Sequence, residues 1–182
     1  GRKVEHKDSL QSRAQAQFPN ATTVHRLDME TSGLMVMALN KSAHRHLSHQ
    51  FETRQVAKQY LARVFGHLAA QKGEVNVPLL CDWPNRPKQK VDFENGKNAL
   101  THWQVIKREA ETTLLELKPY TGRSHQLRVH MLHLGHPIVG DRLYATGKAL
   151  NHCDFLQLHS QKIGFKHPVS QEPMTFAVEA GF

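Results

Sequence analysis

An isolated carboxylate, Asp28, stands within the sequence VHRLDMETSG. Asp28 and Glu30 are the only acidic residues in the stretch 9–51, and both closely follow Arg26. We expect Asp28 to lie on a turn, and catalytic groups are often found on loops held by a rigid scaffold. An ionised carboxylate there can act as a nucleophile or a general base. On spacing alone, the simpler interpretation is that Asp28 caps the turn or pairs with Arg26.

A basic segment with the sequence TGRSHQLRVH occupies residues 121–130. Gly122 precedes a predicted helix with Ser124 as its N-cap, and backbone N–H groups at such an end attract anions. Arg123 lies at that end, and Arg128 lies one turn further along. The density of Arg, His and Gln favours a binding role over an ordinary capped helix with a basic face.

Two aromatic side chains are candidates for stacking on a nucleic-acid base. Tyr60 lies in the sequence KQYLAR. A tyrosine in the middle of a strand is usually a core residue, but beside a basic surface it can stack on an exposed base. Trp83, Arg86 and Lys88 lie on a loop broken by two prolines, 82–88, which we expect to be exposed. That loop is the second stacking candidate.

The 14 histidines raise the question of a metal site. They include two clusters, His44, His46 and His49, and His130, His133 and His136. No HExxH motif occurs, and no cysteine or acid completes either cluster. We therefore expect no metal ion.

Charge and composition limit the class of protein. The 182 residues carry 24 Lys and Arg against 16 Asp and Glu, a net charge of +8, and acids are absent from the windows 53–73 and 117–140. Such windows suit a polyanion, most often nucleic acid, because carboxylates repel phosphates. A merely basic surface is the alternative. Apolar residues make up 39% and charged residues 22%, which is typical of a water-soluble globular protein.

Membrane and secretory features are not expected. The longest uncharged apolar run, Gly33–Leu39, is far too short to span a membrane. The first residues show no apolar signal-peptide core. Cys81 and Cys153 form no CxxC pair, so a reducing cytoplasm is the expected location.

The elements that position these side chains follow from the apolar pattern. Strands are predicted at residues 22–26, 33–39, 58–65, 75–80, 89–93, 101–107, 113–118, 156–165 and 174–178. Helices are predicted behind an N-cap at Ser42 and over 124–134, ended by Gly135, whereas residues 1–21 are expected to be irregular. Strands outnumber helices and do not alternate with them. This favours an α+β fold around a large, mixed but mostly antiparallel sheet flanked by helices and loops.

Four ordered motifs resemble the RluA family of pseudouridine synthases. They are HRLD with TSG at 25–33, KQY at 58–60, GRSHQLRVH at 122–130 and HPIVGDRLY at 136–144. The resemblance extends over nearly the whole chain, and the four motifs together are specific, whereas HRLD alone is not. Residues 80–90, LCDWPNRPKQK, resemble the member that acts on both 23S rRNA and tRNA. The resemblance implies one catalytic domain over 1–182, without the strand and Lys-Pro loop with which family members usually begin.

This resemblance also implies catalytic roles. Asp28 is the expected catalytic aspartate, Tyr60 the residue that stacks on the flipped uracil, and Arg128 the arginine that pairs with the aspartate. Arg26 would enter the RNA stack where the base leaves, and Leu158 would lie beneath the base. The other expected RNA contacts are Arg123, Gln126, Trp83, Arg86 and Lys88.

The implied reaction breaks the N1–C1′ bond of uridine, turns the uracil and joins C5 to C1′. It needs no cofactor or metal, because one carboxylate suffices as a nucleophile at C1′ or C6 or as a base toward a ribose proton. We therefore expect a monomeric, cytoplasmic enzyme that acts on 23S rRNA and tRNA and does not contact a membrane. One rival is a non-catalytic RNA-binding module, which would not need Asp28. The other is a metal-dependent nuclease or hydrolase, which would need clustered carboxylates.

Overall fold

The computed structural model describes residues 8–182, which divide into two compact units. Unit 1 contains the residues up to Leu27, Met35–Val56 and Gly164–Thr175, and unit 2 contains Asp28–Leu34, Ala57–Ile163 and Phe176–Phe182. Asp28, Tyr60 and Arg128 all belong to unit 2, whereas Arg26 belongs to unit 1. One catalytic domain over 1–182 stays a prediction.

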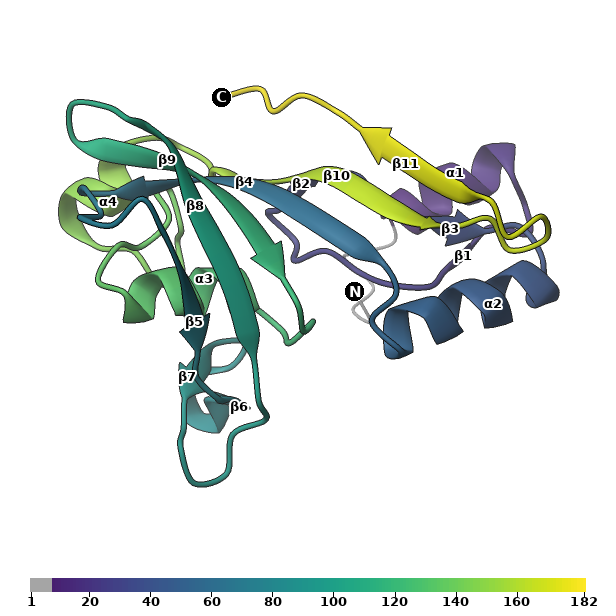
Figure 1. The fold of residues 1–182 in the computed structure, drawn as a ribbon, viewed down its shortest axis with the longest axis horizontal. Helices are drawn as coiled ribbons and strands as arrows, with labels where there is room; N and C mark the ends of the chain where they lie inside the picture. The colour runs from purple at the N-terminus through teal and green to yellow at the C-terminus, as the bar shows by residue number, and fades with distance from the viewer. Residues whose placement is uncertain (1–7) are drawn as a thin grey trace. The chain divides into compact units, whose positions relative to one another are not determined.

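A large sheet is the frame of unit 2 (Figure 1). Its spatial order is β10 (Leu158–Lys166), β4 (Ala57–Phe65), β9 (Thr112–Pro119), β8 (Leu100–Arg108) and β5 (Lys72–Asn76). The strand β10 continues past Ile163 into unit 1, and β11 (Pro173–Ala177) pairs with it. The neighbours β4–β9, β9–β8 and β8–β5 run antiparallel, and the short β2 (Ser32–Gly33) pairs with β10 in parallel. The predicted α+β fold with a large mixed sheet is confirmed.

Strand alternation decides which side chains fill the core. In β8, Thr101, Trp103 and Val105 are buried, while the side chains between them face solvent. The same core takes residues from β4, β9 and α3 (Gln126–His133): Ala62, Val64, Leu115, Leu117, Leu127 and Met131. The predicted apolar stripe of α3 therefore packs on the sheet, which holds this helix in place.

A small two-stranded ribbon extends from the end of the sheet (Figure 1). Its strands are β6 (Leu79–Cys81) and β7 (Gln89–Val91), and the short 3-10 turn η2 (Trp83–Asn85) lies between them. We call residues 79–91 the hairpin. A second apolar cluster joins the hairpin to α3, with Leu79, Ala99 and Val129 buried and Val91 and Tyr144 packed against them.

Unit 1 departs from the predicted pattern at its start. Residues 1–21 are predicted to be irregular, yet α1 spans Leu10–Gln17; residues 1–7 lie outside the described part. Reciprocal hydrogen bonds between Ser9 and Ser12 open this helix. The helix buries no residue, so it has no apolar stripe from which periodicity could predict it.

The single strand predicted over 33–39 is wrong. Two short strands replace it: β2 pairs with β10, and β3 (Met37–Ala38) pairs with β1 (Thr22–Thr23). The chain passes from unit 2 to unit 1 after Leu34, so one continuous strand cannot serve both pairings. The strand predicted over 75–80 likewise divides between β5 and β6.

Helix starts also differ from the predictions. α2 spans Lys41–Glu52, and its N-cap is Asn40, not Ser42, because the Asn40 side chain accepts the N–H of Ala43 at 2.8 Å. α3 begins at Gln126, and Ser124 does not cap it. The short α4 (Gly147–Asn151) shows too little periodicity to be predicted. No helix in the described part of the chain is long and apolar enough to cross a membrane.

Candidate active site

The loop that carries Asp28 is held against β10. The Asp28 carbonyl accepts the N–H of Thr31 at 3.0 Å, so Asp28 opens a turn, as predicted. The next residues form β2, where Ser32 Oγ lies 2.9 Å from Nδ1 of His159 on β10. A fixed strand pairing therefore anchors the C-terminal end of the loop.

Gly33 permits the close approach of this loop to β10. Its φ of 102° lies in the left-handed region, and a Cβ at this position would clash with the carbonyl of Ser160. The same carbonyl accepts the N–H of Leu34 at 2.9 Å. The glycine of the TSG motif thus sets how near the Asp28 loop lies to Ser160.

Tyr60 lies close to Asp28 and Ser160. It sits within β4 opposite Leu117 of β9, on the core side of the sheet, and packs at the edge of the core cluster. Burial raises the pKa of the Tyr60 hydroxyl, the negative charge of Asp28 raises it further, and a hydrogen bond with Ser160 opposes both. Tyr60 is therefore a neutral phenol that lies near Asp28, and its role in the site stays a prediction.

Arg128 is a buried cation on the first turns of α3. Its side chain is 3% exposed, and Nε and Nη2 donate to the two oxygens of Asp141 at 2.8 and 2.6 Å. Burial opposes its charge, but the Asp141 hydrogen bond and the charges of Asp141 and Asp28 raise the pKa of the guanidinium above its usual range. The Asp28 charge thus acts on both Tyr60 and Arg128.

The partner of Arg128 corrects one expectation. The resemblance implies an ion pair with Asp28, whereas the structure pairs Arg128 with Asp141. Within the described residues, no cation lies within 4.0 Å of the Asp28 carboxylate. The reason is geometric, because the turn after Ile138 places Asp141 in a bidentate arrangement that satisfies the guanidinium fork.

Asp141 and Tyr144 were not singled out from the sequence. Asp141 is fully buried and also accepts the backbone N–H groups of Leu143 and Tyr144 at 3.0 and 3.2 Å. The Tyr144 ring lies over the Arg128 guanidinium, 5.2 Å from its Cζ. A signal was present, since Asp141 ends a long acid-free window and is isolated among bases, as Asp28 is.

Gln126 is enclosed by the fold. It is 4% exposed, and its amide oxygen accepts the Thr121 hydroxyl and the Arg123 N–H, while its amide nitrogen donates to Leu100 and Thr101. The expected contact with RNA therefore finds no support in this structure. These bonds attach the start of α3 to β8 instead.

His130 extends the same network through Thr101. Its Nδ1 lies 2.9 Å from the Thr101 hydroxyl and its Nε2 lies 3.3 Å from the Val77 carbonyl. Burial lowers the pKa of His130 to about 4. A neutral His130 therefore ties α3, which carries Arg128, to the sheet.

The remaining predicted RNA contacts lie in different settings. Trp83 is 64% exposed at the end of the hairpin, and the Arg86 guanidinium lies 4.5 Å from its ring centre. Lys88 and Arg123 lie at or near the surface, and Arg26 is exposed in unit 1. Leu158, by contrast, is 2% exposed and belongs to the core cluster, so a place beneath the base stays a prediction.

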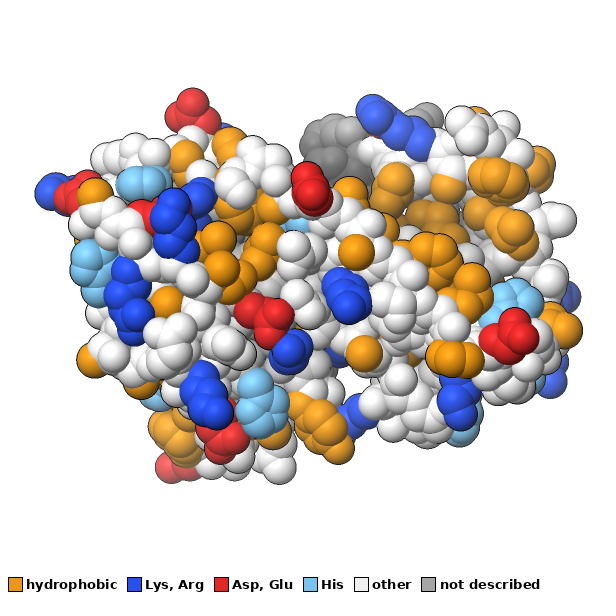
Figure 2. All heavy atoms as spheres, turned by 45° about the horizontal axis from the view of Figure 1, so that its top comes forward, with side chains coloured by type: hydrophobic (Ala, Val, Ile, Leu, Met, Phe, Trp, Pro, Cys, Tyr) orange, Lys and Arg blue, Asp and Glu red, His pale blue; other side chains and the backbone are white. Residues whose placement is uncertain are grey.

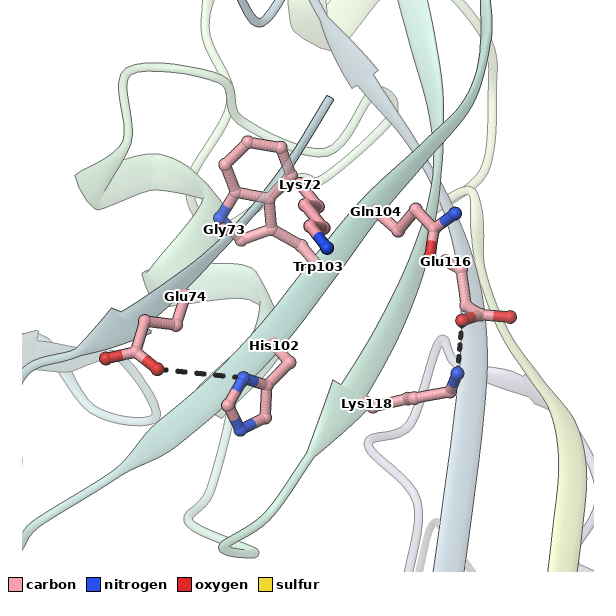
Figure 3. A pocket seen from close by; sticks show the side chains of 8 residues that line it. All are labelled: Lys72, Gly73, Glu74, His102, Trp103, Gln104, Glu116 and Lys118. Atoms are coloured by element: carbon pink, nitrogen blue, oxygen red, sulfur yellow. Dashed lines mark ion pairs between the residues drawn. The ribbon is translucent and has the colours of Figure 1, made fainter. Parts of the chain in front are cut away.

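Basic side chains are spread over one face of the molecule. Figure 2 shows Lys and Arg side chains dispersed over the face drawn, with single acidic groups between them. A groove of about 460 Å³ lies on the outer face of β5, β8 and β9, lined by His102–Glu74 and Lys118–Glu116 pairs among others (Figure 3). Because Leu117 and Tyr60 point to the other face, this groove is separate from the candidate site.

Known proteins share both the sequence and the fold. The family model described as RNA pseudouridylate synthase matches residues 1–133. The chain is 54% identical over its whole length to a dual-specificity RNA pseudouridine synthase RluA of Yersinia pestis, covering 89% of it, and 53% identical to the protein of that name from Escherichia coli (strain K12), covering 84%. Human RNA Pseudouridylate Synthase Domain Containing 1 superposes with a TM-score of 0.85 at 30% identity, over 96% of this chain and 75% of that one.

These likenesses cover the chain from end to end and include the segments that carry Asp28, Tyr60 and Arg128. They favour the catalytic interpretation over the non-catalytic module. The chain belongs to the RNA pseudouridylate synthase family and is an enzyme that isomerises uridine to pseudouridine in RNA.

Proposed function

We propose that Asp28, Tyr60 and Arg128 form the catalytic site of this isomerisation, and that its substrates are 23S rRNA and tRNA. The observation that carries the proposal is electrostatic. The charge of Asp28 acts on both Tyr60 and Arg128, although the three residues come from separate segments. Such coupling between titratable groups is typical of catalytic sites.

Asp28 supplies the carboxylate. Because Arg128 is bonded to Asp141, Asp28 is not locked in an ion pair and keeps its oxygen lone pairs for chemistry. The carboxylate acts at C1′ or C6 as a nucleophile or removes a ribose proton as a base, and in each case N1–C1′ breaks and C5–C1′ forms with no atom gained or lost.

Tyr60 and the RNA-binding residues receive the target base. A uridine stacked in RNA must be flipped out, at a cost of a few kcal/mol. Tyr60 offers a ring on which the uracil stacks, and Arg26 fills the place that the base leaves. The exposed Trp83 stacks on a second base, and the nearby Arg86 and Lys88 neutralise phosphates.

The substrate assignment is supported by similarity. The relatives at 53–54% identity are described as dual-specificity RNA pseudouridine synthases. The hairpin sequence LCDWPNRPKQK also resembles the member that acts on both 23S rRNA and tRNA. We propose further that the enzyme acts as a monomer in the cytoplasm.

The test is pseudouridine formation in 23S rRNA and tRNA transcripts by purified protein in the presence of EDTA. We expect modification of both, and Asp28→Asn should reduce it below detection while RNA binding persists. Asp154→Asn, at an exposed position, is the control and should retain activity. Measurable product from Asp28→Asn, with deamidation excluded by mass spectrometry, would overturn the assignment of Asp28. Modification of only one RNA would overturn the dual specificity.

A further inference from the structure

Tyr144 touches two parts of the molecule that serve different tasks. Its ring lies over Arg128 at 5.2 Å, and its hydroxyl lies 2.8 Å from the backbone N–H of Gln89 on β7 of the hairpin. The hydroxyl is also 2.7 Å from Nδ1 of His125, the residue before α3. One side chain therefore contacts the arginine of the site, the hairpin and the start of the helix.

The backbone of Tyr144 is held by Asp141, the same residue that binds Arg128. Oδ1 of Asp141 accepts the Tyr144 N–H at 3.2 Å and the Arg128 Nη2 at 2.6 Å. The Asp141 carbonyl accepts the N–H groups of Tyr144 and Ala145. A shift of the Tyr144 backbone therefore moves the group that fixes the guanidinium.

The bond to the hairpin does not compete with the hairpin's own pairing. The Gln89 N–H points at the Tyr144 hydroxyl, while the partner of Gln89 in the ribbon is Cys81. Tyr144 also packs on the apolar cluster of Leu79, Ala99 and Val129. The hairpin is thus seated on Tyr144 by one hydrogen bond and by apolar contact.

The other end of the hairpin is exposed. Trp83 and Arg86 stack on each other there, a few residues along the chain from Gln89. The strand β7 connects this exposed end to the Tyr144 hydroxyl, and the Tyr144 ring lies over Arg128.

We propose that Tyr144 is a positioning residue that couples RNA contact at the hairpin to the placement of Arg128. The proposal rests on the proposed function, in which Trp83 binds RNA and Arg128 serves catalysis. Binding at the hairpin then raises turnover as well as affinity, and RNAs that cannot reach the hairpin are modified more slowly even when saturating.

A double-mutant cycle tests the coupling. Single-turnover rates at saturating RNA and binding constants are measured for wild type, Trp83→Ala, Tyr144→Phe and the double variant. Tyr144→Phe keeps the ring over Arg128 and removes the hydroxyl. We expect each single variant to lower the saturating rate about tenfold, and the double variant to be no slower than Tyr144→Phe alone. Trp83→Ala should weaken binding in both backgrounds.

The cycle also has outcomes that overturn the proposal. It fails if Trp83→Ala leaves the saturating rate unchanged in wild type, or lowers it by the same factor in both backgrounds. It also fails if Tyr144→Phe turns over as wild type does. Tyr144→Leu, which removes the ring too, should be slower than Tyr144→Phe, whereas Tyr120→Phe at an exposed tyrosine should match wild type.

A stability measurement guards against loss of folding. Urea unfolding of Trp83→Ala and Tyr144→Phe should show both variants folded under the assay conditions, while their saturating rates fall. A loss of rate that only follows the unfolded fraction contradicts the coupling. Failure of the wild-type protein to form pseudouridine in either RNA refutes the proposed substrates, whereas an active wild type with an additive cycle refutes only the role of Tyr144.

Discussion

Asp28 and Asp141 are the same residue type in two opposite settings. Asp141 is fully buried, and its carboxylate accepts two hydrogen bonds from Arg128 and two from backbone N–H groups. Asp28 is only partly buried on a turn, and within the described residues it forms no ion pair. A carboxylate whose lone pairs are all engaged holds structure, whereas one without an ion-pair partner keeps lone pairs available for chemistry.

The largest expected effect on stability separates these two acids. Asp141→Asn leaves Arg128 charged and buried without its counter-ion, which should lower the free energy of unfolding by about 3–5 kcal/mol. Asp28→Asn should change it by less than about 0.5 kcal/mol, although we expect it to abolish turnover. Urea unfolding of both variants is the measurement. The exposed Glu111–Lys148 pair is the control, since Glu111→Gln should leave the urea midpoint almost unchanged.

Replacing both members of the buried pair sharpens the comparison. Arg128→Met with Asp141→Leu removes both charges, so neither is left unpaired, and stability should return to within about 2 kcal/mol of wild type. Turnover should stay low, because the charge that acts on Asp28 is gone. A double variant that is both stable and active would show that Arg128 serves the fold alone.

His130, on the same helix α3 as Arg128, should make the free energy of unfolding depend on pH. Its pKa is about 4 in the folded protein and 6.5 as the ordinary value, so between these pH values the unfolded chain binds a proton that the folded chain does not. Its contribution is complete above pH 6.5 and is lost as the pH falls toward 4, by about 3 kcal/mol in total.

His130→Gln should flatten that part of the stability profile in urea titrations between pH 4 and 7. The exposed His133 is the matched control, because His133→Gln should preserve the slope. An unchanged slope in His130→Gln would assign the acid sensitivity to other groups.

The smallest effect concerns the Asp28 loop. Gly33→Ala adds a Cβ against the Ser160 carbonyl at positive φ, which should cost about 1–3 kcal/mol and move Asp28 away from Tyr60. We expect a loss of turnover larger than the loss of RNA affinity. Gly147→Ala, also at positive φ but with open space around it, should leave turnover unchanged. Equal turnover in both variants would mean that the loop position is not critical.

The candidate site was partly predictable from local sequence. Asp28 is marked by its isolation among bases and by the turn that follows it, and Trp83 by a proline-broken loop that proves exposed. The strands β4, β8 and β9 and the apolar stripe of α3 follow from periodicity, because each buries one face along a regular element. Periodicity could not predict α1, which buries no residue, or the division of residues 33–39 between two short strands.

Pairings between distant segments were decided by the tertiary structure alone. The sequence by itself determined that a lone carboxylate lies on a turn among bases, because residue type and local spacing are enough for that. It did not determine that Arg128 binds Asp141 or that Tyr144 joins Gln89 to Arg128, since these contacts form only when α3, the hairpin and the turn after Ile138 meet over the sheet. Gln126 shows the same limit, because its burial, and not its type, makes it a structural residue.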